Sequence, residues 1–197
     1  MSNPRADVDQ KWAAMIERHD AFSAEHPEIA GGSPAHHPEV AFLACADARV
    51  SPALLFDQGH HTAFVVRVAG NTATASATAS LAYAVDALGV DLIVVLGHSQ
   101  CGAVTAAFQG VSAPSLSAVL NPIDESLDAS GPCADVDEAI AANVHHNMIR
   151  LRRDHGALGI AVAEGRVAIR GAIHDITDGR LHVVEDVHGA PHVRTSA

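Results

Sequence analysis

The sequence predicts an α/β fold: a mostly parallel central sheet of about four parallel strands plus an added strand, flanked by helices and preceded by an N-terminal helix. Three near-continuous apolar runs, in residues 40–45, 63–69 and 90–97, are typical of parallel strands covered on both faces. Segments with helical spacing alternate with these runs, which favours a parallel α/β sheet. A chain of 197 residues without repeats or linkers is predicted to be one domain.

The N-terminal helix is predicted in residues 9–26. Trp12, Met15 and Ile16 share one face there, as in an amphipathic helix. Residues 27–39 are rich in proline and glycine and are predicted to be a loop.

The middle of the chain supplies the alternating elements of the sheet. Leu81, Ala84, Val85 and Leu88 follow the spacing of a buried helical stripe. The predicted strands lie within residues 40–50, 62–71 and 90–98. The predicted helices occupy residues 75–88 and 101–110.

The C-terminal third is predicted to contain one long helix and a closing hairpin. Residues 111–132, rich in serine, proline and alanine, are expected to be irregular. Asp135 followed by Glu138 resembles a capping box that opens a helix whose buried stripe includes Ile140 and Val144. Residues 158–184 alternate and turn at Asp178-Gly179, which indicates a β-hairpin.

Charge and composition exclude several classes of function. The chain has 12 Lys and Arg against 23 Asp and Glu, a formal net charge of −11, so nucleic acids and anionic membranes are not expected as partners. No apolar run approaches the length of a membrane span. A polar N-terminus without a signal core favours the cytoplasm. In that reducing compartment, three cysteines point to metal binding or catalysis rather than to disulfides.

The metal-ligand candidates lie at two predicted strand ends. Cys45 ends the first apolar run, His98 ends the third, and Cys101 follows three residues later. If those strands are neighbours, the three side chains meet in one crevice at the carboxyl ends of the strands. Two thiolates and one imidazole with a free fourth position are typical of catalytic zinc. A structural zinc would need a fourth ligand, which Cys133 could supply.

Asp47 and Arg49 follow Cys45 at steps of two, which places all three on one side of an extended segment. A carboxylate beside a metal can accept a proton from water or bind the metal itself. Arg49 could decide between these roles through a bidentate contact.

The combination of "CADAR" with "GHSQCGAV" resembles the signature of the β-class carbonic anhydrases, Cys-x-Asp-x-Arg followed by His-x-x-Cys-Gly. The stretches "FVVRVAGN", "SLAYAVDALGVDLIVVLGH" and "GAIHDITDGRL" are similar to the family's second strand, its central helix and strand, and its closing hairpin. The resemblance implies one domain over 1–197, with residues 1–35 as an arm helix and loop that packs on a second subunit.

The resemblance implies a zinc-dependent lyase that interconverts carbon dioxide and bicarbonate through attack by zinc-bound hydroxide. Zn²⁺ would be held by Cys45, His98 and Cys101, with Asp47 as catalytic residue or further ligand and Arg49 as its partner. Two thiolates weaken the Lewis acidity of zinc and make its bound water less acidic. A nearby proton acceptor such as Asp47 therefore becomes more important for the reaction. The small-molecule substrate would be carbon dioxide or bicarbonate, and the enzyme would be a homodimer or larger.

Other positions carry weaker expectations. Gly102 is expected to let a helix start close to the metal and to face substrate, and His36 stands where many relatives use Gln to hold substrate. Phe42 replaces the Trp of members with a bicarbonate inhibitory pocket, so the matching Arg67 does not predict that pocket. His60 and His61 could relay protons. The alternatives are a hydrolase of carbon disulfide or carbonyl sulfide, and a non-catalytic zinc or redox-sensing module.

Overall fold

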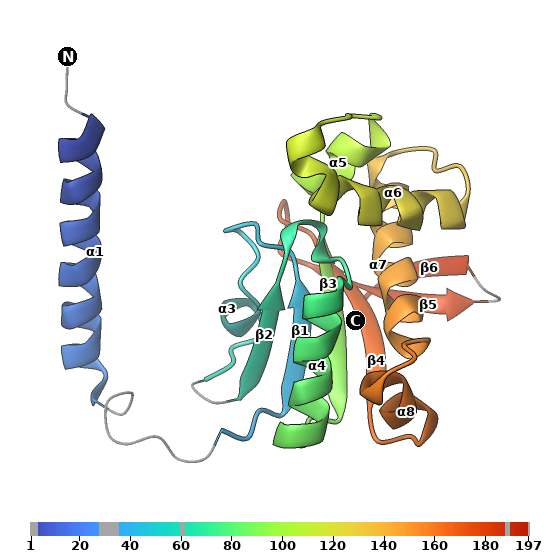
Figure 1. Ribbon diagram of the computed structural model, residues 1–197, viewed down its shortest axis with the longest axis horizontal. Helices are drawn as coiled ribbons and strands as arrows, with labels where there is room; N and C mark the ends of the chain where they lie inside the picture. Colours follow the sequence, from blue (N-terminus) through green and yellow to red (C-terminus); the bar gives the residue numbers. More distant parts are fainter. Residues whose placement is uncertain (1–3, 28–35, 60–61, 188–189, 197) are drawn as a thin grey trace. The chain divides into compact units, whose positions relative to one another are not determined.

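The computed structural model describes residues 4–27, 36–59, 62–187 and 190–196, and it divides into two compact units, Met1–His36 and His37–Ala197 (Figure 1). The first unit contains helix α1 (Pro4–Glu25), which begins before the predicted N-terminal helix and ends one residue before its predicted end. The second contains the sheet and the other helices. A single domain over the whole chain stays a prediction.

The sheet has six strands in the order β2-β1-β3-β4-β5-β6. Strands β2, β1, β3 and β4 are parallel neighbours, whereas β5 and β6 are added antiparallel. The predicted α/β class is therefore confirmed. The strands are β1 (Val40–Ala44), β2 (Ala63–Arg67), β3 (Leu92–His98), β4 (Ala168–His174), β5 (Leu181–Val187) and β6 (Ala190–Thr195).

The register makes the carboxyl ends of the central strands level. Ala44, the last residue of β1, pairs with Leu96 of β3 and with Arg67 of β2. His98 of β3 pairs with His174, the last residue of β4. Residues that follow these strands therefore emerge together at one edge, as the sequence predicted.

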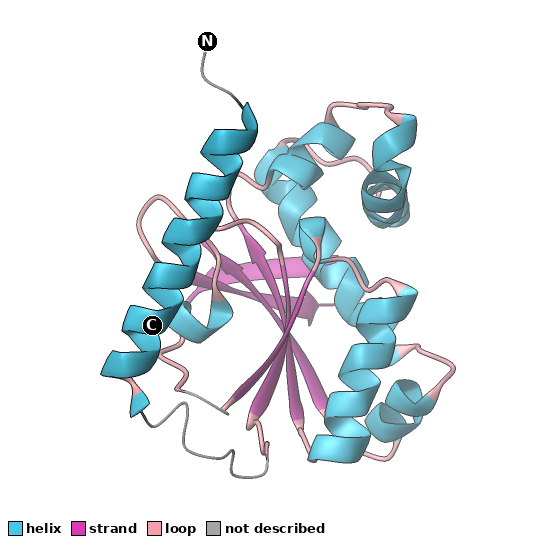
Figure 2. Ribbon diagram, turned by 60° about the vertical axis from the view of Figure 1, so that its left-hand side comes forward, coloured by secondary structure: helices cyan, strands magenta, loops and turns pink. Residues whose placement is uncertain are grey.

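One face of the sheet carries the main core under helices α4 (Ala75–Leu88), α7 (Val136–Arg152) and α8 (Ala157–Ala163) (Figure 2). Leu81 of α4 and Val144 of α7 are fully buried there. Helix α7 opens with the predicted cap, because the Asp135 carboxylate accepts from the N–H of Glu138 at 2.9 Å.

Two strand glycines let α7 lie close to the sheet. A Cβ placed on Gly97 would lie 2.6 Å from Cγ2 of Val144, and one on Gly171 would lie 2.2 Å from Sδ of Met148. Real Cβ atoms essentially never make such contacts. The helix can approach β3 and β4 only because both positions lack a side chain.

The opposite face has a smaller core around Phe42 and Leu96. Helix α3 (Pro52–Leu55), which the sequence analysis did not predict, contributes Leu55 to it. Phe56 follows α3 and packs on Phe42 with ring centroids 5.0 Å apart.

The predicted irregular stretch at residues 111–132 is wrong for most of its length. It contains the 3₁₀ turn η2 (Pro114–Leu116) and helix α6 (Ser117–Ser130). Leu120, Ile123 and Ser126 are buried at helical spacing along α6, and Pro122 is tolerated within it. Helices α5 (Gly102–Phe108) and α6 lie beyond the carboxyl ends of the parallel strands (Figure 1).

The hairpin at Asp178-Gly179 is confirmed, but the flanks differ from the expectation. Residues 157–163 form helix α8 instead of part of a strand, since Leu158 and Ala161 bury one helical side. Strand β6 was not expected; it lies at the sheet edge, contains Pro191, and its Arg194 pairs with Glu185 of β5 at 2.9 Å. Among the described residues, no helix combines the length and apolarity that a bilayer crossing requires.

The close approach of α7 gives a stability prediction. Gly171→Ala forces the added methyl into Met148 and Val144, and overpacking of this kind costs about 1–3 kcal/mol. Gly59→Ala is the matched control, because nothing lies within 4 Å of a Cβ there. Urea unfolding checks this prediction. Equal free energies of unfolding for the two variants would contradict it.

Candidate metal centre

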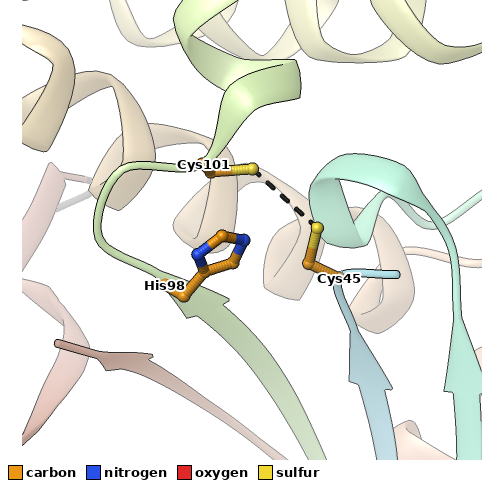
Figure 3. A group of neighbouring side chains, drawn as sticks. All are labelled: Cys45, His98 and Cys101. Atoms are coloured by element: carbon orange, nitrogen blue, oxygen red, sulfur yellow. Dashed lines mark hydrogen bonds between the residues drawn. The ribbon is translucent and has the colours of Figure 1, made fainter. Parts of the chain in front are cut away.

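Three side chains from two segments of the chain converge at the carboxyl edge of the sheet (Figure 3). Cys45 follows β1 directly, His98 is the last residue of β3, and Cys101 precedes α5. One ligand atom from each lies within 4.8 Å of the other two, and the sulfurs are 3.9 Å apart. The convergence expected from the sequence is present, and all three residues are buried.

His98 places its second ring nitrogen, Nε2, beside this group. Its Nδ1 lies 2.9 Å from the carbonyl of Ser99, and a carbonyl can only accept, so Nδ1 donates a proton to this bond. Nε2 is buried and has no hydrogen-bond partner among the described residues. A buried imidazole nitrogen without a partner beside two sulfurs fits a zinc ion, because zinc favours nitrogen and sulfur donors.

The two sulfurs lie within hydrogen-bond distance, and either one can be the donor. The bond between them lowers the pKa of Cys45, although burial opposes the change. The same bond and burial raise the pKa of Cys101. The pair therefore favours loss of one thiol proton, and the thiolate is the form that binds a metal.

Asp47 is held by Arg49 at the open side of the group. The Arg49 guanidinium donates to both carboxylate oxygens at 2.9 and 2.7 Å, and its backbone N–H adds a third bond at 2.9 Å. These bonds keep the pKa of Asp47 well below its usual range. Asp47 Oδ2 lies 4.0 Å from Nε2 of His98, so the pair borders the three ligand candidates.

Arg67 of β2 clamps the Cys45–Asp47 loop, a role that the sequence analysis missed. Its Nε donates to the carbonyl of Cys45 at 3.0 Å, and its Nη2 donates to the carbonyl of Asp47. The available signal was the parallel pairing of the first two strands, which sets Arg67 opposite Ala44.

Gly70 is a second missed contributor. Its N–H donates to Cys45 Sγ at 3.4 Å, and its carbonyl accepts from the buried amide of Asn143 at 2.8 Å. Its φ of 72° suits glycine, and a Cβ would lie 2.6 Å from Cδ1 of Ile123. Asn143 of helix α7 is thus connected to Cys45 through the backbone of Gly70.

The remaining candidates lie outside the ligand group. Gly102 opens α5 with nothing within 4 Å of a Cβ. His36 is exposed and belongs to the unit Met1–His36, so its predicted substrate contact stays a prediction. Cys133, the possible fourth ligand, donates instead to the carbonyl of Gly131 at 3.7 Å. His60 and His61 lie outside the described residues.

Two cavities of the second unit lie away from the ligand group, which consists of Cys45, His98 and Cys101. One, of about 830 Å³, is lined by α5 and α6, and another, of about 640 Å³, is lined by Ser99, Asp175 and the start of α7. Neither is lined by Cys45, His98 or Cys101. Arg49, whose side chain is 51% exposed, instead marks the open side of the group.

The amino-acid sequence is similar to those of known proteins. A family model described as carbonic anhydrase matches residues 40–181. "Carbonic anhydrase 2" of Mycobacterium tuberculosis is 33% identical over 192 residues, which cover 90% of this chain and 93% of that protein. A carbonic anhydrase of Mycolicibacterium smegmatis is 32% identical and covers 91% of this chain and 95% of its own length.

A solved structure agrees with these relatives. A structure from the tetrameric β-carbonic anhydrases of the ascomycete Sordaria macrospora matches with a TM-score of 0.68 at 26% identity, covering 92% of this chain and 97% of that one.

The ligand group predicts a specific metal stoichiometry. We expect about one zinc per chain in the wild type and loss of most of it in Cys45→Ala, His98→Ala or Cys101→Ala, because each change removes a donor atom. Cys133→Ala is the matched control and should keep its zinc. Elemental analysis of the purified chains provides the measurement. A ligand variant that retains full zinc would contradict the assignment.

Proposed function

Because the chain belongs to the β-class carbonic anhydrase family, we infer that it catalyses the reversible hydration of carbon dioxide to bicarbonate and a proton, with zinc as its cofactor. The enzyme is a lyase. The observation that carries this inference is the buried group of Cys45, His98 and Cys101 beside the paired Asp47 and Arg49.

The ligand group supplies the place for the metal. Cys45, His98 and Cys101 would hold zinc through two sulfurs and the free Nε2. When bound, zinc supplies the Lewis acidity that makes water a nucleophile near neutral pH. Burial of all three residues excludes bulk water from the metal side.

Asp47 accepts a hydrogen bond from the reacting water, and its ionised carboxylate stabilises the proton that this water releases toward solvent. Arg49 fixes this role, because its two bonds direct both carboxylate oxygens and hold them beside the ligand group. If Arg49 released the carboxylate, Asp47 could join the ligand group, since its Oδ2 already lies 4.0 Å from Nε2 of His98. Asp47 would then act as the predicted further ligand and block turnover.

Gly102 and His36 are assigned to the substrate side. Gly102 offers open space at the start of α5, beside the ligand Cys101, so a small substrate can approach there without meeting a side chain. His36 would donate a hydrogen bond to bicarbonate, in the place where many relatives use Gln.

The enzyme self-associates as a homodimer or a larger assembly. Val8, Trp12, Met15, Ile16 and Phe22 of α1 are all exposed. A stripe of this kind on one helix needs an apolar partner surface, and a second copy of the chain would provide it. The Sordaria macrospora proteins are described as tetrameric, which supports assembly. We assign the enzyme to the cytoplasm, where thiol ligands stay reduced.

The role of Asp47 gives the test of the activity. Asp47→Asn removes the charged acceptor of the hydrogen bond from water, and we expect turnover to fall by about 10²-fold or more. Zinc content should stay unchanged, because Asp47 is held by Arg49 rather than by the ligand group. Stopped-flow hydration of carbon dioxide measures the rate, with Asp178→Asn as the control for loss of an exposed carboxylate.

Three outcomes would overturn parts of this assignment. A wild-type chain that binds zinc yet hydrates no carbon dioxide would not be a carbonic anhydrase, and the alternative of a non-catalytic zinc or redox-sensing module would apply. A chain that instead consumes carbon disulfide or carbonyl sulfide would be the hydrolase alternative. Loss of zinc in Asp47→Asn would make Asp47 primarily a ligand.

The apolar stripe of α1 gives the test of assembly. Trp12→Glu places a charge in the stripe, so we expect a smaller assembly by sedimentation equilibrium. Gln10→Glu is the matched control, because it adds the same charge to an exposed polar position of the same helix. An unchanged mass for Trp12→Glu would show that the stripe does not hold the subunits together.

A further inference from the structure

The two residues between His98 and Cys101 are tied to the end of β4. The backbone N–H of Ser99 donates to the carbonyl of His174 at 2.9 Å. Its hydroxyl donates to Asp175 Oδ1 at 3.0 Å and accepts from the N–H of Ile176 at 3.0 Å. Both the backbone and the side chain of Ser99 are therefore fixed to the neighbouring segment.

This anchoring acts on the orientation of His98. The carbonyl of Ser99 accepts the Nδ1 proton of His98 at 2.9 Å, and this bond sets both the tautomer and the rotation of the ring. A shift of the Ser99 peptide would turn the ring and carry Nε2 away from the two sulfurs.

The turn requires support from outside itself. Gln100 adopts φ of 57°, a left-handed conformation that residues other than glycine rarely take. The Gln100 side chain reaches Thr177 Oγ1 at 3.5 Å, and Asp175 Oδ1 also accepts from the N–H of Thr177 at 2.8 Å. Asp175 thus links the turn to the loop of the β4–β5 hairpin.

We propose that Ser99 and Asp175 are positioning residues that hold His98 in its zinc-binding orientation. The proposal rests on the proposed zinc function and extends it to two residues outside the ligand group of Cys45, His98 and Cys101. Partners behind a metal-binding histidine typically change metal affinity by about 10- to 100-fold when they are removed.

The primary test compares Ser99→Ala with Ser99→Thr in the full chain. Ser99→Ala removes both hydroxyl bonds but keeps the carbonyl that contacts His98. We expect zinc to bind about 10-fold or more weakly, measured by competition with a chromogenic chelator. Ser99→Thr retains a hydroxyl and should restore most of the affinity. The d–d bands of the Co²⁺-loaded chain should change in Ser99→Ala and return toward the wild type in Ser99→Thr.

A second pair separates positioning from loop stability. Asp175→Ala should weaken zinc binding, whereas Asp175→Asn keeps an oxygen acceptor and should retain most of it. Asp178→Ala is the matched control, because it removes another carboxylate from the same hairpin loop. The Asp178 carboxylate accepts a hydrogen bond from the N–H of Arg180 at 2.9 Å. Thermal unfolding of the zinc-free variants shows the effect on the fold alone.

The outcomes are distinct for each claim. Equal zinc affinity and an identical Co²⁺ spectrum in Ser99→Ala and the wild type would overturn the proposal, as would equal weakening by Asp178→Ala. If Asp175→Ala fails to fold, the Ser99 pair still decides the matter. A wild-type chain that binds no zinc would overturn the proposed function as well as this inference.

Discussion

The metal centre depends on the register between two parallel neighbours, β1 and β3. Ala44 lies opposite Leu96, which makes both strands end at one level and brings the residues behind them together. Leu43 and Val95 pack in the main core, whereas Phe42 and Leu96 pack in the core of the other face. A slip of one residue would exchange these faces, so the buried pattern of the strands also fixes where the ligand candidates lie.

Each part of the centre is braced by a different element of the fold. Arg67 of β2 holds the backbone around Cys45, and Asn143 of α7 fixes Gly70, whose N–H contacts the same sulfur. Ser99 ties the segment before Cys101 to the end of β4. Buried polar groups are stable only when they are hydrogen-bonded, so these braces stabilise the fold and orient the ligands at the same time.

Much of this arrangement could be predicted from the sequence, because spacing and apolar runs report on burial. Helix α4 and the strands β1, β2 and β3 follow from such runs, and the paired motifs identify the ligand candidates. Helix α6 was not predicted because it contains Pro122, and helix α8 was not predicted because residues 158–163 alternate as in a strand. The bonds of Arg67 leave no local pattern, since they join side chain to backbone across 22 and 20 positions, and only the pairing of the first two strands points to them.

The unexpected strand β6 governs how the sheet can extend. Pro191 lacks an N–H, and Arg194 is already paired with Glu185, so this border offers a poor template for another chain. The opposite border, β2, carries Phe64 and the exposed Val65. The two borders of the sheet therefore differ, and β2 is better suited than β6 to pairing with a strand of another chain.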